Sequence, residues 1–189
     1  MERNSQIKII ESQLRECFGQ VVWTHKTQEK CADIVWKRHM RIKITQIILS
    51  ALTTTGILVA VFGDKHWIGI CSAILSALLF GLNTYTKDYD LGEIAQKHSN
   101  SAASLWNVRE RYLSLLTDIK ANLLEIEEIK EIRDDLQKEL LNIYKGSPRT
   151  LNKAYQKATK ALKVNEEMTF SISEIDSLLP IDLRKDRDG

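Results

Sequence analysis

The chain has 189 residues, with 27 Lys and Arg against 25 Asp and Glu, so its formal net charge is +2. This length suits one domain of ordinary size. We also expect no direct binding of nucleic acid. Only eight Gly and two Pro occur among many Leu, Ile, Lys and Glu, which favours long helices and excludes an extensive β-sheet. We therefore predict an all-α protein.

Residues 1–43 are predicted to form an amphipathic cytoplasmic helix, and no apolar segment near Met1 resembles a cleavable signal peptide. Seam residues recur in this helix with alternating spacings of three and four, which is the heptad pattern. They are Ile7, Ile10, Leu14, Cys17, Val21, Thr24, Gln28, Cys31 and Val35. Because the seam begins apolar and turns polar in its middle, we expect the helix to pack on a partner helix.

Residues 44–86 contain two uncharged apolar runs, 44–62 and 67–86, joined by the link 63–66. A membrane-spanning helix needs about 20 predominantly apolar residues, because each adds about 1.5 Å across a hydrocarbon core of about 30 Å. Both runs have that length, and the short link suits a tight helical hairpin. The alternative, a hairpin buried in a soluble bundle, is disfavoured because the other predicted helices have narrow apolar stripes and many charges.

The charges that flank the runs predict the orientation of the hairpin in the membrane. The residues concerned are Lys37, Arg38, Arg41 and Lys43 before the first run, Lys87 after the second, and Asp64 and Lys65 in the link. Because cytoplasmic flanks carry the excess of Lys and Arg, both termini are expected to be cytoplasmic. The expected location is the inner (cytoplasmic) membrane, crossed twice.

Each predicted span carries one stripe of polar side chains. The stripe residues are Gln46, Ser50 and Thr53 in the first span, and Ser72, Ser76 and Asn83 in the second. One interpretation is that they line a water-filled path once several hairpins assemble, since polar groups at membrane depth tend to face a cavity or a bundle interior. The other is that they hydrogen-bond neighbouring helices, at about 1 kcal/mol or less each. The sequence favours neither.

A row of small residues recurs at every fourth position of the second run: Gly69, Ala73, Ala77 and Gly81. Such a row lets another helix approach closely, and in lipid this contact matters because no hydrophobic force drives helices together. We expect it to meet Gly56 and Ala60 of the first run, or a helix of another subunit.

Residues 87–179 are predicted to form a cytoplasmic helical region that completes a bundle. A helical pattern covers about 90–145, and its apolar spacing shifts phase at Ile129, so it is one long helix or a broken pair. Gly146, Ser147 and Pro148 then suit a helix end, an N-cap and a first turn, which predicts a new helix over 148–165.

The last predicted helix covers residues 171–179. Ser171 and Glu174 have the spacing of a capping box, and Pro180 ends the helical pattern. We expect residues 180–189 to be a disordered tail.

A basic face is predicted on the helix over 148–165. It consists of Arg149, Lys153, Lys157 and Lys160. This face has two specific interpretations: it contacts anionic lipid headgroups, or it binds an anionic nucleotide. The favoured alternative is a solvated lysine face on a packed helix.

The sequence lacks the common patterns of catalysis and metal binding. His25, His39, His66 and His98 are isolated, and no glycine-rich phosphate loop or nucleophile elbow occurs. Three cysteines without a CxxC pair do not predict disulfides. We expect no enzyme activity, no cofactor and no metal site.

Two features combine with the hairpin and its very short link: an N-terminal helix with Trp23 and His25, and a cytoplasmic stretch Trp106-x-x-Arg109-x-x-Tyr112. This arrangement resembles the SLATT family, two-helix membrane effectors of prokaryotic conflict systems. The resemblance covers about residues 6–179, so nearly the whole chain would be a single SLATT-like domain.

The resemblance implies a membrane effector of antiviral defence that oligomerises and forms a pore or disrupts the membrane when a partner or nucleotide signal activates it. Its implied partners are membrane lipid, further copies of the chain, and a co-encoded sensor or nucleotide-signal enzyme. The resemblance supplies no catalytic residue. We expect Arg109 and Tyr112 to contribute to packing, and Arg109 could also cap a helix or form an ion pair. The alternative function is a membrane-anchored scaffold or sensor that docks a partner through its cytoplasmic helices.

Overall fold

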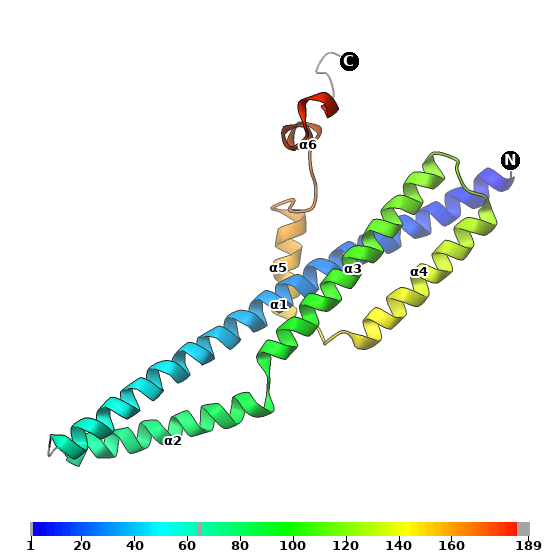
Figure 1. The fold of residues 1–189 in the computed structure, drawn as a ribbon. Coiled ribbons are helices and arrows are strands. Elements are labelled where there is room, and N and C mark those ends of the chain that lie inside the picture. The colour runs from blue at the N-terminus through cyan, green and yellow to red at the C-terminus, as the bar shows by residue number, and fades with distance from the viewer. Residues whose placement is uncertain (1, 64–65, 185–189) are drawn as a thin grey trace.

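The computed structural model describes residues 2–63 and 66–184, and every regular element among them is a helix, which confirms the all-α fold class. Figure 1 shows an elongated molecule with a two-helix hairpin at one end and a helical bundle at the other. The elements are α1 (Glu2–Phe62), α2 (His66–Asp88), α3 (Leu91–Lys120), α4 (Ile126–Gly146), α5 (Asn152–Lys163), α6 (Ile172–Leu178) and the 3₁₀ turn η1 (Ile181–Leu183).

Helix α1 is uninterrupted over 61 residues and includes both the predicted cytoplasmic helix and the first predicted span. It contains no Pro, so no residue inside it lacks a backbone N–H for the helical ladder. At about 1.5 Å per residue it is about 90 Å long. Helix α2 packs along its C-terminal part, whereas α3 and α5 pack along its N-terminal part (Figure 1).

The core of the bundle lies between α1, α3 and α4. Its most deeply buried apolar side chains are Leu14, Val21, Leu105, Val108, Tyr112, Leu115, Ile129 and Leu136. Leu14 and Val21 belong to the predicted heptad seam, and so do the buried Gln28, Cys31 and Val35. The expectation that this helix packs on a partner is therefore confirmed, and the partner is α3.

The region predicted as a helix over about 90–145 is a broken pair, and a single long helix is wrong. Helix α3 ends at Lys120 and α4 begins at Ile126. Asn122 adopts the left-handed conformation with φ 56°, which Asn tolerates better than most residues. The amide of Glu125 donates to the Glu128 carboxylate at 2.8 Å and starts α4. The shift of apolar spacing at Ile129 marks the change from one helix to the next.

The prediction that a helix starts at Pro148, with Ser147 as its N-cap, is wrong. Gly146 is the last residue of α4, and the next helix begins only at Asn152. The connection is held on α1, because Gln28 Nε2 donates to the carbonyl of Pro148 at 3.5 Å and the Leu151 amide donates to Cys31 Sγ at 3.3 Å.

The C-terminal end of the described chain contains the predicted capping box. Ser171 Oγ accepts from the Glu174 amide at 3.3 Å, and the Glu174 carboxylate accepts from the Ser171 amide at 2.7 Å, which confirms the helix start. The expectation of disorder from residue 180 is wrong for residues 181–183, which form η1. Residues 185–189 of the predicted tail lie outside the described residues.

A buried polar layer interrupts the apolar seam between α1 and α3. His98 Nδ1 donates to Gln28 Oε1, and His25 Nδ1 donates to the carbonyl of Ala102 at 2.9 Å. Burial lowers the pKa of His98 from its ordinary value of 6.5. The layer fixes the register of the two helices, because a slip would leave these groups without partners.

We expect the unfolding temperature of the full chain in detergent to fall when the pH drops below about 6.5, the ordinary histidine value. The unfolded chain then binds a proton at His98 that the folded chain does not, and one such group lowers stability by at most about 1.4 kcal/mol per pH unit. His98→Gln should reduce this decline. His39→Gln, at a histidine stacked on Trp36 outside the core, is the control that should retain it. Equal declines in the two variants would contradict the assignment.

Candidate functional site

The apolar hairpin is exposed along most of its length. Only 6% of the most apolar window in each helix is buried, and Phe62 at the tip is 84% exposed. A hairpin wrapped inside a soluble bundle would have most of this surface covered. The soluble alternative is therefore wrong, and residues 44–62 of α1 together with α2 form a hairpin suited to lipid.

Four of the six predicted stripe residues lie where the two spans meet. Gln46 Nε2 donates across the hairpin to Asn83 Oδ1 at 2.9 Å and to Thr86 Oγ1 at 3.1 Å. Thr53 and Ser72 are buried, and each hydroxyl donates to a carbonyl of its own helix at 2.8 Å and 2.9 Å. Within one copy of the chain, Gln46 and Asn83 therefore join the two spans by a hydrogen bond, whereas Thr53 and Ser72 are buried and bond within their own helices.

Ser50 and Ser76, the other two stripe residues, are exposed. Ser50 lies in an open groove of about 600 Å³ along the hairpin, whereas Ser76 is not among its lining residues. The groove is lined by Gln46, Ile47, Ser50, Ala51, Thr54, Thr55, Leu79 and Asn83. Sequence reasoning missed Thr54 and Thr55, although Thr54, four residues after Ser50, lies on the same face of the helix.

The small residues of the second span do not form one continuous contact with α1. A Cβ added to Gly69 would lie 3.4 Å from Ala60 Cβ, as expected, but Gly56 faces Ser72 and not the row. Ala73 and Ala77 are exposed, and nothing lies within 4 Å of a Cβ at Gly81. The remaining small residues therefore face outwards from the hairpin.

Gly56→Leu should separate the two spans. A Cβ at this position would lie 2.1 Å from Ser72 Oγ, and overpacking of this kind costs about 1–3 kcal/mol. We expect the hairpin to unfold at a lower mole fraction of SDS, followed by circular dichroism. Gly81→Leu, where the added side chain meets open space, is the matched control. Equal effects of the two substitutions would contradict this contact.

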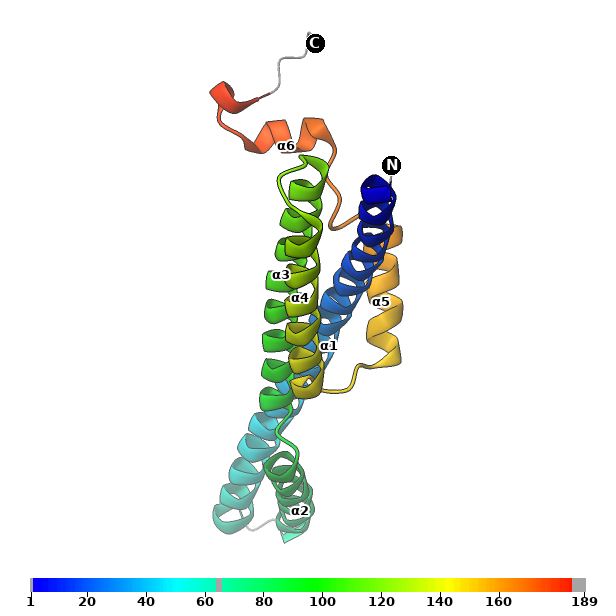
Figure 2. The same cartoon turned by 90° about the vertical axis from the view of Figure 1, so that its right-hand side faces the viewer.

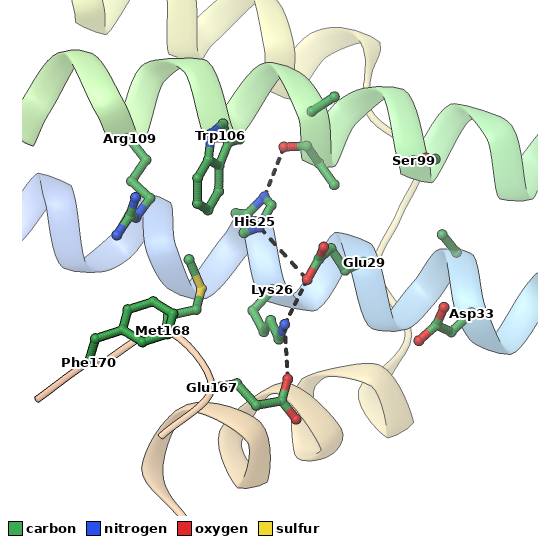
Figure 3. Close-up of a pocket in the computed structure, with 13 residues that line it drawn as sticks. His25, Lys26, Glu29, Asp33, Ser99, Trp106, Arg109, Glu167, Met168 and Phe170 are labelled. Carbon is green, nitrogen blue, oxygen red and sulfur yellow. Dashed lines mark hydrogen bonds and ion pairs between the residues drawn. The ribbon is translucent and has the colours of Figure 1, made fainter. Parts of the chain in front are cut away.

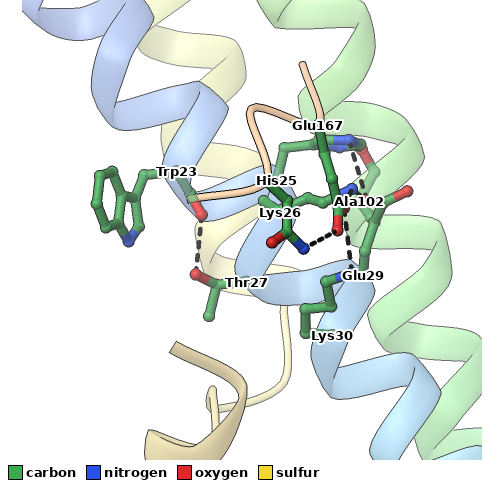
Figure 4. A network of polar contacts seen from close by, with 9 residues as sticks. Trp23, His25, Lys26, Thr27, Glu29, Lys30, Ala102 and Glu167 are labelled. Atoms are coloured by element: carbon green, nitrogen blue, oxygen red, sulfur yellow. Dashed lines mark hydrogen bonds and ion pairs between the residues drawn. The ribbon is translucent and has the colours of Figure 1, made fainter. Parts of the chain in front are cut away.

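A second polar site lies on the N-terminal half of α1, where residues 164–171 cross it. We call these residues the strap. The Glu167 carboxylate binds Lys26 Nζ at 3.0 Å and Lys30 Nζ at 3.3 Å, and Lys26 also binds Glu29 at 2.8 Å (Figure 4). These bonds attach the strap to α1.

The charges of this attachment reinforce one another. The hydrogen bond from Lys26, helped by Asn165 and Lys30, lowers the pKa of Glu167 to about 2. Burial disfavours the charged form of Lys26, but hydrogen bonds to Glu29 and Glu167 outweigh it and raise the pKa of Lys26. Glu167 and Lys26 are therefore both ionised near neutral pH.

The strap closes one side of a pocket of about 660 Å³ between α1 and α3 (Figure 3). The Arg109 guanidinium lies 4.6 Å from the centre of the Trp106 ring, pairs with Glu110, and has a buried Nε without a hydrogen-bond partner among the described residues. His25 lies 5.4 Å from the same ring. Sequence reasoning quoted these three residues but gave no signal that they line a pocket.

Arg109 and Tyr112, for which the sequence suggested packing or pairing, have distinct environments. Tyr112 is fully buried in the core, so packing describes its position, and burial raises its pKa. Arg109 pairs and stacks on the pocket wall. The pocket also contains Glu29, Asp33 and Glu167, so its charges are mixed and do not indicate a simple anion site.

Three residues of the predicted basic face, Lys153, Lys157 and Lys160, lie on α5, whereas Arg149 lies in the connection before the helix. The residues Arg149, Lys153, Lys157 and Lys160 are all exposed, while Ala154, Ala158 and Ala161 are buried. Helix α5 packs on α1 beside Trp23. Its N-terminal end lies at Cys31, whose Sγ accepts a hydrogen bond from the Leu151 amide. Cys31 is about 20 Å of helix from Ile44, where the span begins. This exceeds the screening length of about 8 Å at physiological salt, which disfavours headgroup contact.

Glu167→Gln should loosen the strap. Replacing the carboxylate removes the charge that two lysines bind, so we expect the amides of residues 164–171 to exchange faster with deuterium. Because the pKa of Glu167 is lowered to about 2 from 4.5, the attachment should be complete above pH 4.5 and should weaken as the pH falls towards 2.

Glu166→Gln is the matched control, since Glu166 forms no ion pair with another described residue. It should leave the exchange of the strap unchanged. Unaltered exchange in Glu167→Gln would show that the ion pairs do not hold the strap.

A protein-family model described as the SMODS and SLOG-associating 2TM effector domain family 4 matches residues 10–174. The match covers most of the chain, so the chain belongs to this family of two-transmembrane effector domains, which is associated with conflict and antiviral systems. The resemblance to the SLATT family is thereby confirmed. No curated protein and no solved structure matches the chain.

Proposed function

From its membership of the SLATT effector family, we propose that this chain is the membrane-acting component of an antiviral system. It lies in the inner membrane with both termini in the cytoplasm, assembles with further copies, and opens a pore when a partner or nucleotide signal acts on its cytoplasmic bundle. It is not an enzyme and needs no cofactor. A co-encoded sensor or nucleotide-signal enzyme supplies the signal.

The observation that carries this proposal is the polar groove along the hairpin. Hydroxyls of Ser50, Thr54 and Thr55 line an open surface inside a segment that is otherwise suited to lipid. Polar groups at membrane depth are costly in contact with lipid and tend to face a cavity or a protein interior. A neighbouring hairpin would shield the groove, and several hairpins together would enclose a polar path.

The continuous helix α1 supports the coupling between signal and pore. Its N-terminal half carries the strap and the pocket, and its C-terminal half carries Ser50 and Thr54 of the groove. A shift or rotation of α1 in the bundle therefore changes which of its side chains face the path. The span has no loop that would absorb such a motion.

Ser50→Leu combined with Thr54→Leu should weaken depolarisation of cells that express the chain with its genomic neighbours under phage challenge, measured with a voltage-sensitive dye. Two apolar side chains in the path raise the barrier to ions. Cys71→Leu, at an exposed position outside the groove, is the control and should depolarise like the unchanged chain.

Further variants separate the alternatives. Gln46→Leu and Ser76→Leu test whether the wider polar stripe also lines the path. Each variant should reduce depolarisation while it is expressed at the level of the unchanged chain. If any apolar hairpin of equal length can replace residues 44–86 while protection persists without depolarisation, the chain is a membrane-anchored scaffold and the pore proposal fails.

A further inference from the structure

The two segments that follow α4 carry opposite charges. The stretch 149–163 contains no acidic residue and five basic ones: Arg149, Lys153, Lys157, Lys160 and Lys163. The stretch 166–183, which we call the C-terminal arm, contains no basic residue and five acidic ones: Glu166, Glu167, Glu174, Asp176 and Asp182. Protein surfaces usually intersperse the two signs, so these separated blocks form a pair of complementary surfaces.

The basic surface is rigid and available. Helix α5 is anchored to α1 through its buried alanines, and it carries the exposed Lys153, Lys157 and Lys160 of the basic face, with Arg149 just before it. The four residues of that face form no ion pair with other described residues, whereas Lys163 lies over the Trp23 ring at 5.3 Å. Tyr155, 51% exposed on the same helix, adds apolar area beside the lysines.

The arm presents a large apolar surface that the rest of the chain leaves uncovered. Six of its side chains are between 45% and 80% exposed: Phe170, Ile172, Ile175, Leu178, Ile181 and Leu183. Among the described helices none packs along α6, which Figure 1 shows apart from the bundle and Figure 2 shows near the end of α3 that leads to α4. A helix of seven residues is marginal without such packing, so a partner surface would stabilise it.

The geometry makes a neighbouring copy the natural occupant of the basic face. The attachment of Glu167 to Lys26 and Lys30 fixes the strap on α1, and the arm then leads away from its own α5 (Figure 1). Copies inserted in one membrane share one orientation. An arm that projects to the side of the long axis of α1 therefore reaches the bundle of the next copy.

We propose that the C-terminal arm of one copy docks on the basic face of α5 in a second copy. Acidic side chains of the arm pair with Lys153 and Lys157, and its apolar side chains cover the exposed apolar area of α5. The contact is head-to-tail, so each copy gives one arm and receives another, and the assembly grows until a ring closes or a chain forms. This deepens the proposed function, on which it rests for the common orientation of the copies.

Charge reversal tests the contact in the full chain, with the mass of the assembly in detergent micelles measured by light scattering. Lys153→Glu with Lys157→Glu reverses the face, and Glu166→Lys with Asp182→Lys reverses the arm. We expect each double variant to lose the assembly, and raised salt to weaken the assembly of the unchanged chain. Lys130→Glu with Lys145→Glu, at exposed lysines of α4, is the control and should assemble normally.

Recombination of the variants distinguishes pairing from misfolding. Mixing the face variant with the arm variant brings opposite charges together at every contact, so the assembly should return. It should also return in one chain that carries both pairs of substitutions. Loss of assembly without rescue in either case would overturn the proposal, as would unchanged assembly of both variants.

Two further outcomes keep the alternatives apart. If the face variant assembles normally but loses binding to vesicles that contain anionic lipid, the face binds headgroups and the proposal is overturned. Membrane potential measured on the same variants separates the two proposals. These measurements use cells that express the chain with its genomic neighbours under phage challenge. Charge-dependent assembly without depolarisation by the unchanged chain supports the docking contact and contradicts the pore. If both charge-reversed variants still assemble and still depolarise the cells, the docking contact is contradicted.

Discussion

One constraint governs the structure: the single helix α1 packs on other helices over one part of its length and must be compatible with lipid over the other. Residues 2–43 of α1 must pack on protein, and residues 44–62 must tolerate lipid, without a break between them. Every large helix contact involves α1 or the helix α3 that packs on it. The seam therefore changes character along one backbone, from apolar near Leu14, through the polar layer at Gln28, to the uncharged run that begins at Ile44.

The strap adds a second connection between the ends of the chain. Glu167 contacts Lys26 and Lys30 from a segment far along the sequence, and the same segment closes the pocket beside Trp106. The pocket, the polar layer and the N-terminal end of α5 all contact the same stretch of α1, residues 25–33. A ligand or partner that moved the strap would thus act on the helix that continues into the membrane.

Local patterns predicted the elements well where local chemistry decides them. Two uncharged runs and a heptad spacing are properties of neighbouring residues, as is the capping box at Ser171. The start of α5 was mispredicted because Pro148 and Leu151 bond to Gln28 and Cys31, which are 120 residues away in the chain.

The candidate site shows the same limit of sequence reasoning. The polar stripes were found, but spacing alone gave no means of dividing them between the hairpin interface at Gln46 and the open groove at Ser50. Nothing near Lys26 in the sequence indicated that a distant glutamate would bind it. Pairings between remote segments depend on the packing of whole helices, which periodicity does not encode.

The two halves of the molecule differ in how strongly they are held, and this difference locates the part that can move. The bundle buries large side chains such as Leu105, Tyr112 and Leu136 from water, and each contributes about 1.5–3 kcal/mol. The hairpin has no such drive in lipid. Its spans are joined by the bonds of Gln46 and the close approach at Gly56, and polar contacts of this kind contribute about 1 kcal/mol or less each. In the proposed assembly, a rearrangement that exchanges these contacts for similar ones with a neighbouring hairpin would cost little, while the bundle would keep its fold and transmit the motion of α1.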